Sequence, residues 1–175
     1  MSGKPVTDAA SPGRSATPAV APAKTARRRS REFALQALYA WQIARGTPSE
    51  IVAQVKGYEG FERADAKLAE TLVRGVSERA AELEALITPH LDRSFASLSP
   101  VERAIVYIGT FELLAQQQTP FKVIVNEAIE LGKSFGGTDG HKFVNGVLEK
   151  LAAQLRSGEF ARVRGAAPRS ADPLQ

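Results

Sequence analysis

The feature that most constrains the fold of this chain is the spacing of its apolar residues between positions 33 and 155, where they recur every three or four residues. This spacing places apolar side chains along one side of an α-helix, whereas a half-buried strand would alternate apolar and polar residues. Prolines and glycines interrupt the pattern and mark where one helix ends and the next begins. The sequence contains no strand pattern and no internal repeat. It therefore predicts an all-α protein.

The clearest helix start lies just before residue 100. Ser99 is a favourable N-cap, Pro100 suits the first helical position, and Glu102 completes a capping box. The helix that follows runs to about Gln117 and is apolar over most of its circumference. A helix with so little polar surface is expected at the centre of its part of the molecule.

The other boundaries give a two-lobed organisation. We expect further helices over residues 29–45, 48–56, 61–87, 119–135 and 138–156. They form an N-terminal lobe over about residues 27–88 and a C-terminal lobe over about residues 98–156, with a connection between them. Residues 1–26 are rich in Ala, Pro, Ser and Thr and lack a periodic apolar pattern, so they predict a disordered leader. Residues 157–175 are expected to be a short tail.

An arginine run leads directly into the first predicted helix: Arg27, Arg28, Arg29 and Arg31. Positive charge in a first helical turn opposes the helix dipole, and a locally unfavourable choice of this kind is often functional. Residues 1–32 carry a net charge of +5, whereas residues 33–155 carry −3. Basic arms bind phosphate backbones by releasing counterions, so the run suggests a nucleic-acid contact. The alternative is a solvated tail with no partner.

The first predicted helix is apolar on two sides. At about 100° per residue, one arc contains Phe33 and Trp41, and a second stripe contains Leu35, Tyr39 and Ile43. One stripe is enough to dock a helix on its own core, so the second suggests a protein partner. Because an exposed apolar patch can also pair with itself, a homodimer through the same stripe is an alternative. A further alternative is that Tyr39 packs inside the protein.

Phe143 stands beside Lys142 at the start of the last predicted helix, roughly a quarter-turn from the apolar stripe of Val144 and Val147. An aromatic ring next to a cation is suited to stacking an unpaired base and contacting its phosphate. The alternative is that Phe143 forms the edge of the core. Periodicity alone favours the core edge.

The residues needed for catalysis are largely missing. The chain has no cysteine, and its two histidines, His90 and His141, lie far apart in sequence. No nucleophile–base set or metal site can therefore be assembled, and we expect no enzyme activity, no cofactor and no metal. The glycines before Lys142 lack the spacing of a phosphate-binding loop. Glu127 and Glu130 are expected to be solvated charges.

Two further expectations concern the compartment and the Gly-rich loop. No apolar run approaches the roughly 18 residues that a membrane span requires. The absence of cysteine suits a reducing compartment, and we expect a cytoplasmic protein. In the loop, Asp139 is expected to act as an N-cap or as a partner of the helix dipole.

Three segments together resemble the NusB family of bacterial transcription antitermination factors. They read RRRSREFALQALYAWQ at residues 27–42, SPVERAIVYIGTFELL at residues 99–114 and TPFKVIVNEAIELGKSFGGTDGHKFVNGVLEKLA at residues 119–152. The resemblance covers about Arg27 to Leu155, is weaker over residues 61–98, and leaves the leader and the tail outside. It implies an all-α fold of two helical subdomains and no catalysis.

The resemblance also implies a function. Proteins of this family bind the boxA element of nascent ribosomal RNA-operon transcripts together with NusE, a protein of the small ribosomal subunit. The heterodimer joins an antitermination complex on RNA polymerase. The alternative for this chain is a non-catalytic protein-interaction or homodimeric helical module without RNA specificity of its own.

The family motif can be carried over residue by residue. It assigns RNA contacts to Arg27, Arg28, Arg29, Arg31, Lys133, Lys142 and Phe143, and it places Asp139 beside the RNA as an acidic position that modulates complex formation. Tyr39 and Glu102 match positions that face NusE, and Leu35 joins them because it shares the stripe of Tyr39. For Phe143 the resemblance outweighs the periodicity and favours an RNA contact.

Overall fold

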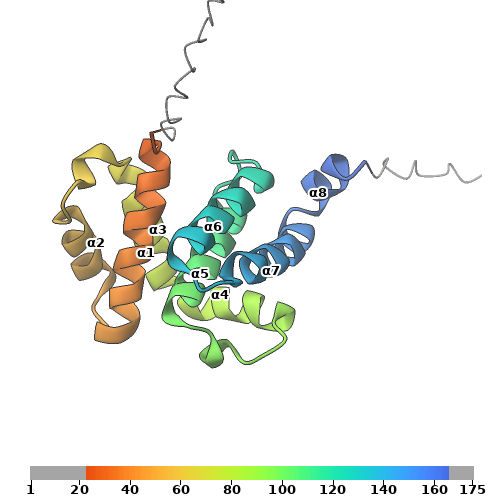
Figure 1. The fold of residues 1–175 in the computed structure, drawn as a ribbon, viewed down its shortest axis with the longest axis horizontal. Helices are drawn as coiled ribbons and strands as arrows, with labels where there is room; N and C mark the ends of the chain where they lie inside the picture. Colours follow the sequence, from red (N-terminus) through yellow and green to blue (C-terminus); the bar gives the residue numbers. More distant parts are fainter. Residues whose placement is uncertain (1–22, 166–175) are drawn as a thin grey trace, which may run out of the picture.

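The computed structural model describes residues 23–165 of the 175-residue chain. These residues form α-helices and short 3₁₀ turns, and no strand occurs among them, which confirms the all-α prediction (Figure 1). The predicted disordered leader lies almost wholly outside this range, although Ala26 already belongs to the first helix. Within residues 23–165, no helix is both long enough and apolar enough to cross a membrane.

Eight α-helices follow one another in the described part of the chain. They are α1 (Ala26–Ala44), α2 (Pro48–Lys56), α3 (Ala66–Glu78), α4 (Ala80–Ile87), α5 (Pro100–Ala115), α6 (Phe121–Phe135), α7 (Gly140–Leu155) and α8 (Ser157–Val163). Short 3₁₀ turns occupy Phe61–Arg63, Thr88–His90 and Phe95–Ser97.

Local capping explains where two of these helices begin. The capping box predicted before α5 is present: Ser99 Oγ accepts a hydrogen bond from Glu102 N at 3.2 Å, and Glu102 Oε2 accepts one from Ser99 N at 2.9 Å. The first helix begins earlier than expected because Thr25 Oγ1 caps it by accepting from Arg28 N at 3.1 Å. The arginine run therefore lies within the first turns of α1.

Two predicted boundaries are wrong because tertiary packing overrides the local pattern. The helix expected over residues 61–87 breaks at Arg79, where the backbone leaves helical geometry at φ −113° and ψ 17°, and α4 contacts α5 and α7 as well as α3. The expected tail begins with a helix, α8. The ring centroids of its Phe160 and of Phe121 lie 5.3 Å apart, and its Glu159 accepts a hydrogen bond from Phe121 N at 2.9 Å.

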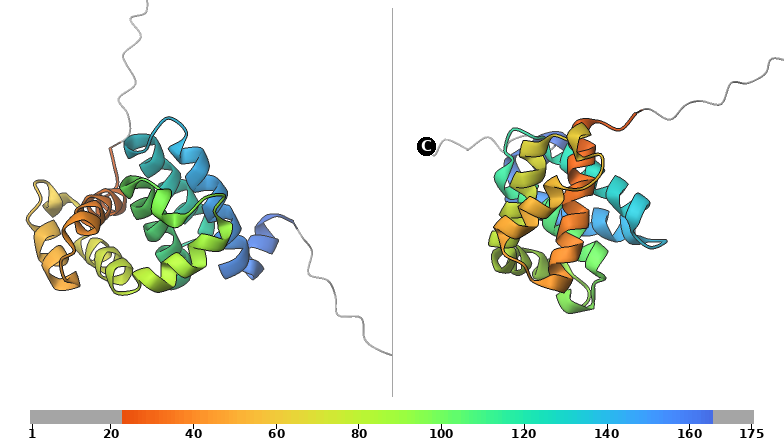
Figure 2. Two further views of the ribbon diagram at one scale, coloured as in Figure 1. Left: turned by 90° about the horizontal axis from the view of Figure 1, so that it is seen from below. Right: turned by 90° about the vertical axis from the view of Figure 1, so that its left-hand side faces the viewer.

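The helices pack around α5. Helix α1 lies against α2, α3 and α5, while α6 and α7 pair with each other and with α5 (Figure 2). Every residue of α5 from Ala104 to Leu113 is buried, which confirms its expected central place. Helices α6 and α7 meet closely at Gly132, where a Cβ atom would lie 2.9 Å from Cα of His141. This contact places the start of α7 directly beside the end of α6.

Candidate nucleic-acid interface

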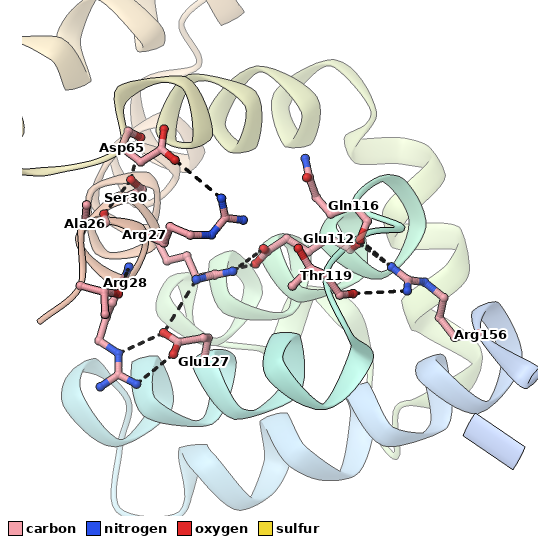
Figure 3. A network of polar contacts seen from close by, with 12 residues as sticks. Ala26, Arg27, Arg28, Ser30, Asp65, Glu112, Gln116, Thr119, Glu127 and Arg156 are labelled. Carbon is pink, nitrogen blue, oxygen red and sulfur yellow. Dashed lines mark hydrogen bonds and ion pairs between the residues drawn. The ribbon is translucent and has the colours of Figure 1, made fainter. Parts of the chain in front are cut away.

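The arginine run divides into outward and inward side chains. The side chain of Arg27 is 48% exposed, and its Nη1 lies 3.6 Å from a carboxylate oxygen of Asp65. Arg28 crosses to α6, where its Nε and Nη2 donate to the two carboxylate oxygens of Glu127 at 3.0 and 2.9 Å (Figure 3). Arg29 is half-buried and forms no ion pair with residues 23–165. Arg27, Arg28 and Arg29 thus lie at or near the surface.

Arg31 is not part of that surface. Its side chain is 3% exposed, and it donates from Nε and Nη2 to the carboxylate of Glu112 on α5 at 2.9 and 2.7 Å. Glu112 is 1% exposed. The physical reason is the helical register, because Arg31 falls on the side of α1 that carries Ala34 and Leu38 into the core. The prediction that Arg31 contacts RNA from an exposed arm is therefore wrong.

The charges of this cluster stabilise one another. The hydrogen bond with Glu127 raises the pKa of Arg28. Burial lowers the pKa of Arg31, but its hydrogen bonds and ion pairing with Glu112, together with the charge of Glu127, outweigh burial and raise the pKa. The hydrogen bond from Arg28 lowers the pKa of Glu127. The expectation that Glu127 is a solvated charge is wrong, because its side chain is only 18% exposed and joins α6 to α1.

Acid should remove the contribution of Glu127 to stability. Its pKa is lowered in the folded state, so the contribution is complete above the ordinary Glu pKa of about 4.3 and is lost as the pH falls through the lower folded-state pKa. We expect Glu127→Gln to melt below the unmodified protein at pH 7, with the difference narrowing on acidification. Thermal unfolding followed by circular dichroism measures this. Glu78→Gln, which alters the exposed ion pair with Arg74, is the control. If the difference in melting temperature between Glu127→Gln and the unmodified protein did not change with pH, ionisation of Glu127 would not contribute to stability.

The other side chains matched to RNA contacts lie in and on either side of the loop between α6 and α7. Lys142 and Asp139 form an ion pair at 3.0 Å, with 72% and 73% of their side chains exposed. Lys133, near the end of α6, pairs with Glu130 at 3.1 Å. Asp139 stands at the N-cap position of α7, but its side chain makes no capping hydrogen bond and pairs with Lys142 instead. All of these cations are accessible.

Phe143 lies at the edge of the hydrophobic core, beneath the guanidinium of Arg93. It is half-buried and packs against the core, yet the Cζ atom of Arg93 lies 4.8 Å from its ring centroid. Beside the ring is a hollow of about 180 Å³, lined by His90, Asp92, Lys142, Phe143, Gly146, Val147 and Lys150. Nothing lies within 4 Å of the Cβ position of Gly146, so α7 leaves space at this point.

Helix α6 connects the arginine run with the Phe143 region. Glu127 holds Arg28, Lys133 follows on the same helix, and Phe135 ends it. At 1.5 Å per residue the distance along the axis from Glu127 to Phe135 is roughly 12 Å. No hydrogen bond or ion pair in residues 23–165 joins the arginines to Phe143 directly.

The surface expected to meet a protein partner is smaller than predicted. Tyr39 is 42% and Ile43 65% exposed, but Leu35 is 2% exposed and belongs to the hydrophobic core. Leu35 is therefore excluded from partner contact, because the helices packed around the first half of α1 cover it. Gln42 Nε2 donates to the carbonyl oxygen of Pro100 at 2.8 Å, so this end of α1 lies beside the start of α5, which carries Glu102.

Sequence reasoning missed two residues at these sites. Arg93 lies in the weakly patterned connection before α5, where no periodic signal distinguishes it. Its Nη2 lies 3.6 Å from Glu102 Oε1, and its guanidinium lies over Phe143. Glu112 did carry a signal, since it is the one acid of α5 beyond the first turn and lies in an otherwise apolar run, which implies a buried cationic partner. In the part of the chain that the structure describes, no cluster of three His, Cys, Asp or Glu residues could hold a metal ion.

Known proteins resemble this chain in both sequence and structure. The NusB family model matches residues 28–153. Proteins described as transcription antitermination protein NusB from Burkholderia mallei (strain SAVP1) and Burkholderia thailandensis are each 52% identical over 143 residues, which is 82% of this chain and 99% of theirs.

Two solved structures share the fold. T. maritima NusB superposes with a TM-score of 0.68 at 30% identity, covering 79% of this chain and 99% of that one. A complex described as antitermination factors NusB and NusE with double-stranded RNA gives a TM-score of 0.67 at 27% identity, covering 74% and 97%. The chain belongs to the NusB family.

Proposed function

We propose that this protein is an RNA-binding transcription antitermination factor that binds boxA of ribosomal RNA-operon transcripts together with NusE. The observation that carries the proposal is the set of cations at or near the surface on α1, α6 and α7, together with the half-buried ring of Phe143: Arg27, Arg28, Arg29, Lys133, Lys142 and Phe143. Its relatives are named transcription antitermination proteins, and one solved neighbour contains both NusE and RNA.

RNA phosphate groups can replace the acidic side chains that pair with two of these cations. Lys133 and Lys142 are held only by exposed carboxylates, those of Glu130 and Asp139. Exposed ion pairs contribute about 0–1 kcal/mol, so a phosphate group can replace the carboxylate at little cost. Asp139 would then compete with RNA for Lys142 and tune the affinity, which agrees with its position beside the RNA in the family.

The second surface is the proposed NusE site. Tyr39 and Ile43 supply exposed apolar area on α1, and Glu102 supplies a carboxylate at the adjoining start of α5. The heterodimer would join the antitermination complex on RNA polymerase, so the protein acts in the cytoplasm as an adaptor and not as an enzyme. A homodimer through Tyr39 and Ile43 is the competing use of this surface, and the mass of the protein in solution with and without NusE distinguishes the two.

Phe143→Ala should weaken RNA binding while leaving the fold intact. Base–aromatic stacking contributes about 1–3 kcal/mol per base, so we expect a loss of roughly 5- to 150-fold in affinity. Fluorescence anisotropy of a labelled single-stranded boxA RNA measures it, with the scrambled strand and the corresponding duplex as competitors, and circular dichroism checks the helix content.

Tyr39→Ala provides the reciprocal control for that experiment. It should weaken the association with NusE, because exposed aromatic area is lost at the proposed partner surface. It should leave binding of RNA to the isolated protein unchanged. If Phe143→Ala bound boxA RNA as tightly as the unmodified protein, the assignment of the RNA site would be wrong. If the unmodified protein bound no RNA with or without NusE, the proposed function itself would be wrong.

A further inference from the structure

Arg93 connects the two proposed surfaces. It lies in the loop between the 3₁₀ turns Thr88–His90 and Phe95–Ser97. Its Cζ atom is 4.8 Å from the centroid of the Phe143 ring, and its Nη2 is 3.6 Å from Glu102 Oε1. Glu102 is in turn fixed by the hydrogen bond that its other carboxylate oxygen accepts from Ser99 N. The guanidinium is therefore held between an aromatic ring and an anchored carboxylate.

This position matters for stacking on Phe143. The guanidinium occupies the place over the ring that an incoming base would take on this side. A base must then either displace Arg93, which would break its contacts with both Phe143 and Glu102, or stack on the guanidinium itself. Arginine guanidinium planes stack on bases much as aromatic rings do. The side chain of Arg93 is 46% exposed, so its outer side is open to solvent.

We propose that Arg93 is an RNA-contacting residue, and that a nucleobase stacks on its guanidinium with the ring of Phe143 behind it. Glu102 is a positioning residue in this arrangement, because it restrains the guanidinium without touching the base. The inference rests on the proposed RNA-binding function and adds a stacking residue to its site. It also gives Glu102 a role in RNA binding that does not require a protein partner.

The neighbouring charges favour a base at this place and the phosphates elsewhere. Asp92 precedes Arg93 and lines the hollow beside Phe143, and its carboxylate would repel a phosphate group. Lys142 and Lys150 line the same hollow from α7 and offer positive charge to the RNA backbone. Stacking on Arg93 therefore does not require a phosphate to approach the carboxylates of Asp92 and Glu102.

The test measures binding of the labelled single-stranded boxA RNA to the full chain with no NusE present. We expect Arg93→Ala to weaken binding on the order of tenfold, the scale of one lost base stack. Arg93→Lys keeps the charge but lacks the planar group, so it should lose most of the same affinity. Glu102→Gln should produce a smaller loss in the same direction. If Arg93 only shielded Phe143, Arg93→Ala would bind RNA as tightly as the unmodified protein or more tightly, and the inference would be overturned.

Arg164→Ala is the matched control. The Cζ atom of Arg164 also lies over a phenylalanine ring, 5.0 Å from the centroid of Phe160, and its guanidinium also pairs with a carboxylate, that of Glu149. It removes the same charge outside the proposed site and should leave the affinity within about twofold of the unmodified value. If Arg164→Ala and Arg93→Ala lost the same RNA affinity, both losses would come from the change in net charge, and the stacking role of Arg93 would be overturned.

The outcomes also separate this inference from the proposed function. RNA binding that is weakened by Phe143→Ala but unchanged by Arg93→Ala would reject the role of Arg93 and leave the proposed function standing. Absence of RNA binding by the unmodified protein would reject both. Circular dichroism of each variant checks that the exposed loop substitution has not unfolded the protein.

Discussion

Replacing Glu112 by alanine is expected to lower the free energy of unfolding by about 3–5 kcal/mol. The carboxylate of Glu112 is 1% exposed and accepts two hydrogen bonds from the guanidinium of Arg31, which is 3% exposed. Its removal leaves a buried cation without its main partner, and burying an unpaired charge is costly. Glu127 remains 3.9 Å from Arg31 Nη1 and keeps the loss toward the lower end of this range.

A double substitution separates the cost of an unpaired charge from the value of the pair. Arg31→Met combined with Glu112→Leu replaces both charges by apolar side chains of similar size. Because desolvation of two ions offsets most of their attraction, such replacements are often neutral or stabilising. We therefore expect the double variant to be at least as stable as the unmodified protein. Urea unfolding followed by circular dichroism measures both variants.

Glu78→Ala is the control for this pair of variants. It removes a carboxylate from an exposed ion pair, in which Arg74 Nη1 lies 3.4 Å from Glu78 Oε1, and should change stability by no more than about 0.5 kcal/mol. A loss for Glu112→Ala no larger than that of Glu78→Ala would show that the interior pair contributes little. A double variant as unstable as Glu112→Ala would show instead that packing around these positions is what matters.

Arg156→Ala is the second substitution expected to destabilise the protein strongly, by about 3 kcal/mol. Arg156 is 6% exposed and donates to the carbonyl oxygens of Glu112, Leu113, Gln116 and Thr119, around and beyond the end of α5 (Figure 3). The last carbonyl groups of a helix have no partner within the helix. The carbonyl oxygens of Glu112 and Gln116 also accept from Gln116 N and Thr119 N, so the loss falls on those of Leu113 and Thr119. A buried acceptor that loses its donor costs about 1–3 kcal/mol, and such costs are not fully additive.

The geometry of the guanidinium can be tested separately from its charge. Arg156→Lys keeps a cation at the end of α5 but has no planar fork of donors, so it should fall between the unmodified protein and Arg156→Ala. Arg162→Ala, at an exposed position of α8, is the control and should lie within about 0.5 kcal/mol of the unmodified protein. Unfolding in urea measures all three. Equal stability of Arg156→Ala and Arg162→Ala would contradict the capping role.

The helices with strong local signals could be predicted from the sequence. The cap at Ser99 and the apolar run that follows it gave the position of α5 and its central place, because both depend on residues close together in the chain. The break at Arg79 and the helix α8 could not be predicted in this way. They depend on contacts with α5, α6 and α7, which are distant in sequence and leave no periodic signal.

The candidate site was predictable only in part, because the burial of some of its residues also depends on contacts that are distant in sequence. The arginine run and Phe143 were identified, but nothing in the run itself distinguishes the buried Arg31 from its surface neighbours. The distinction comes from Glu112, 81 residues further along the chain. Leu35 was misassigned for the same reason, since the stripe that it shares with Tyr39 is covered at one end and open at the other.

The close contact at Gly132 bears on which molecule is expected to change shape when the proposed complex with RNA forms. Because a Cβ atom there would lie 2.9 Å from the backbone of His141, α6 and α7 pack at short range, and we expect the backbones at Lys133 and Phe143 to keep their separation. A binding surface that is already rigid loses little conformational entropy when its ligand arrives. The ordering then falls on the RNA. The protein is thereby expected to select strands flexible enough to adapt to its spacing, which adds a mechanical criterion to recognition of the bases.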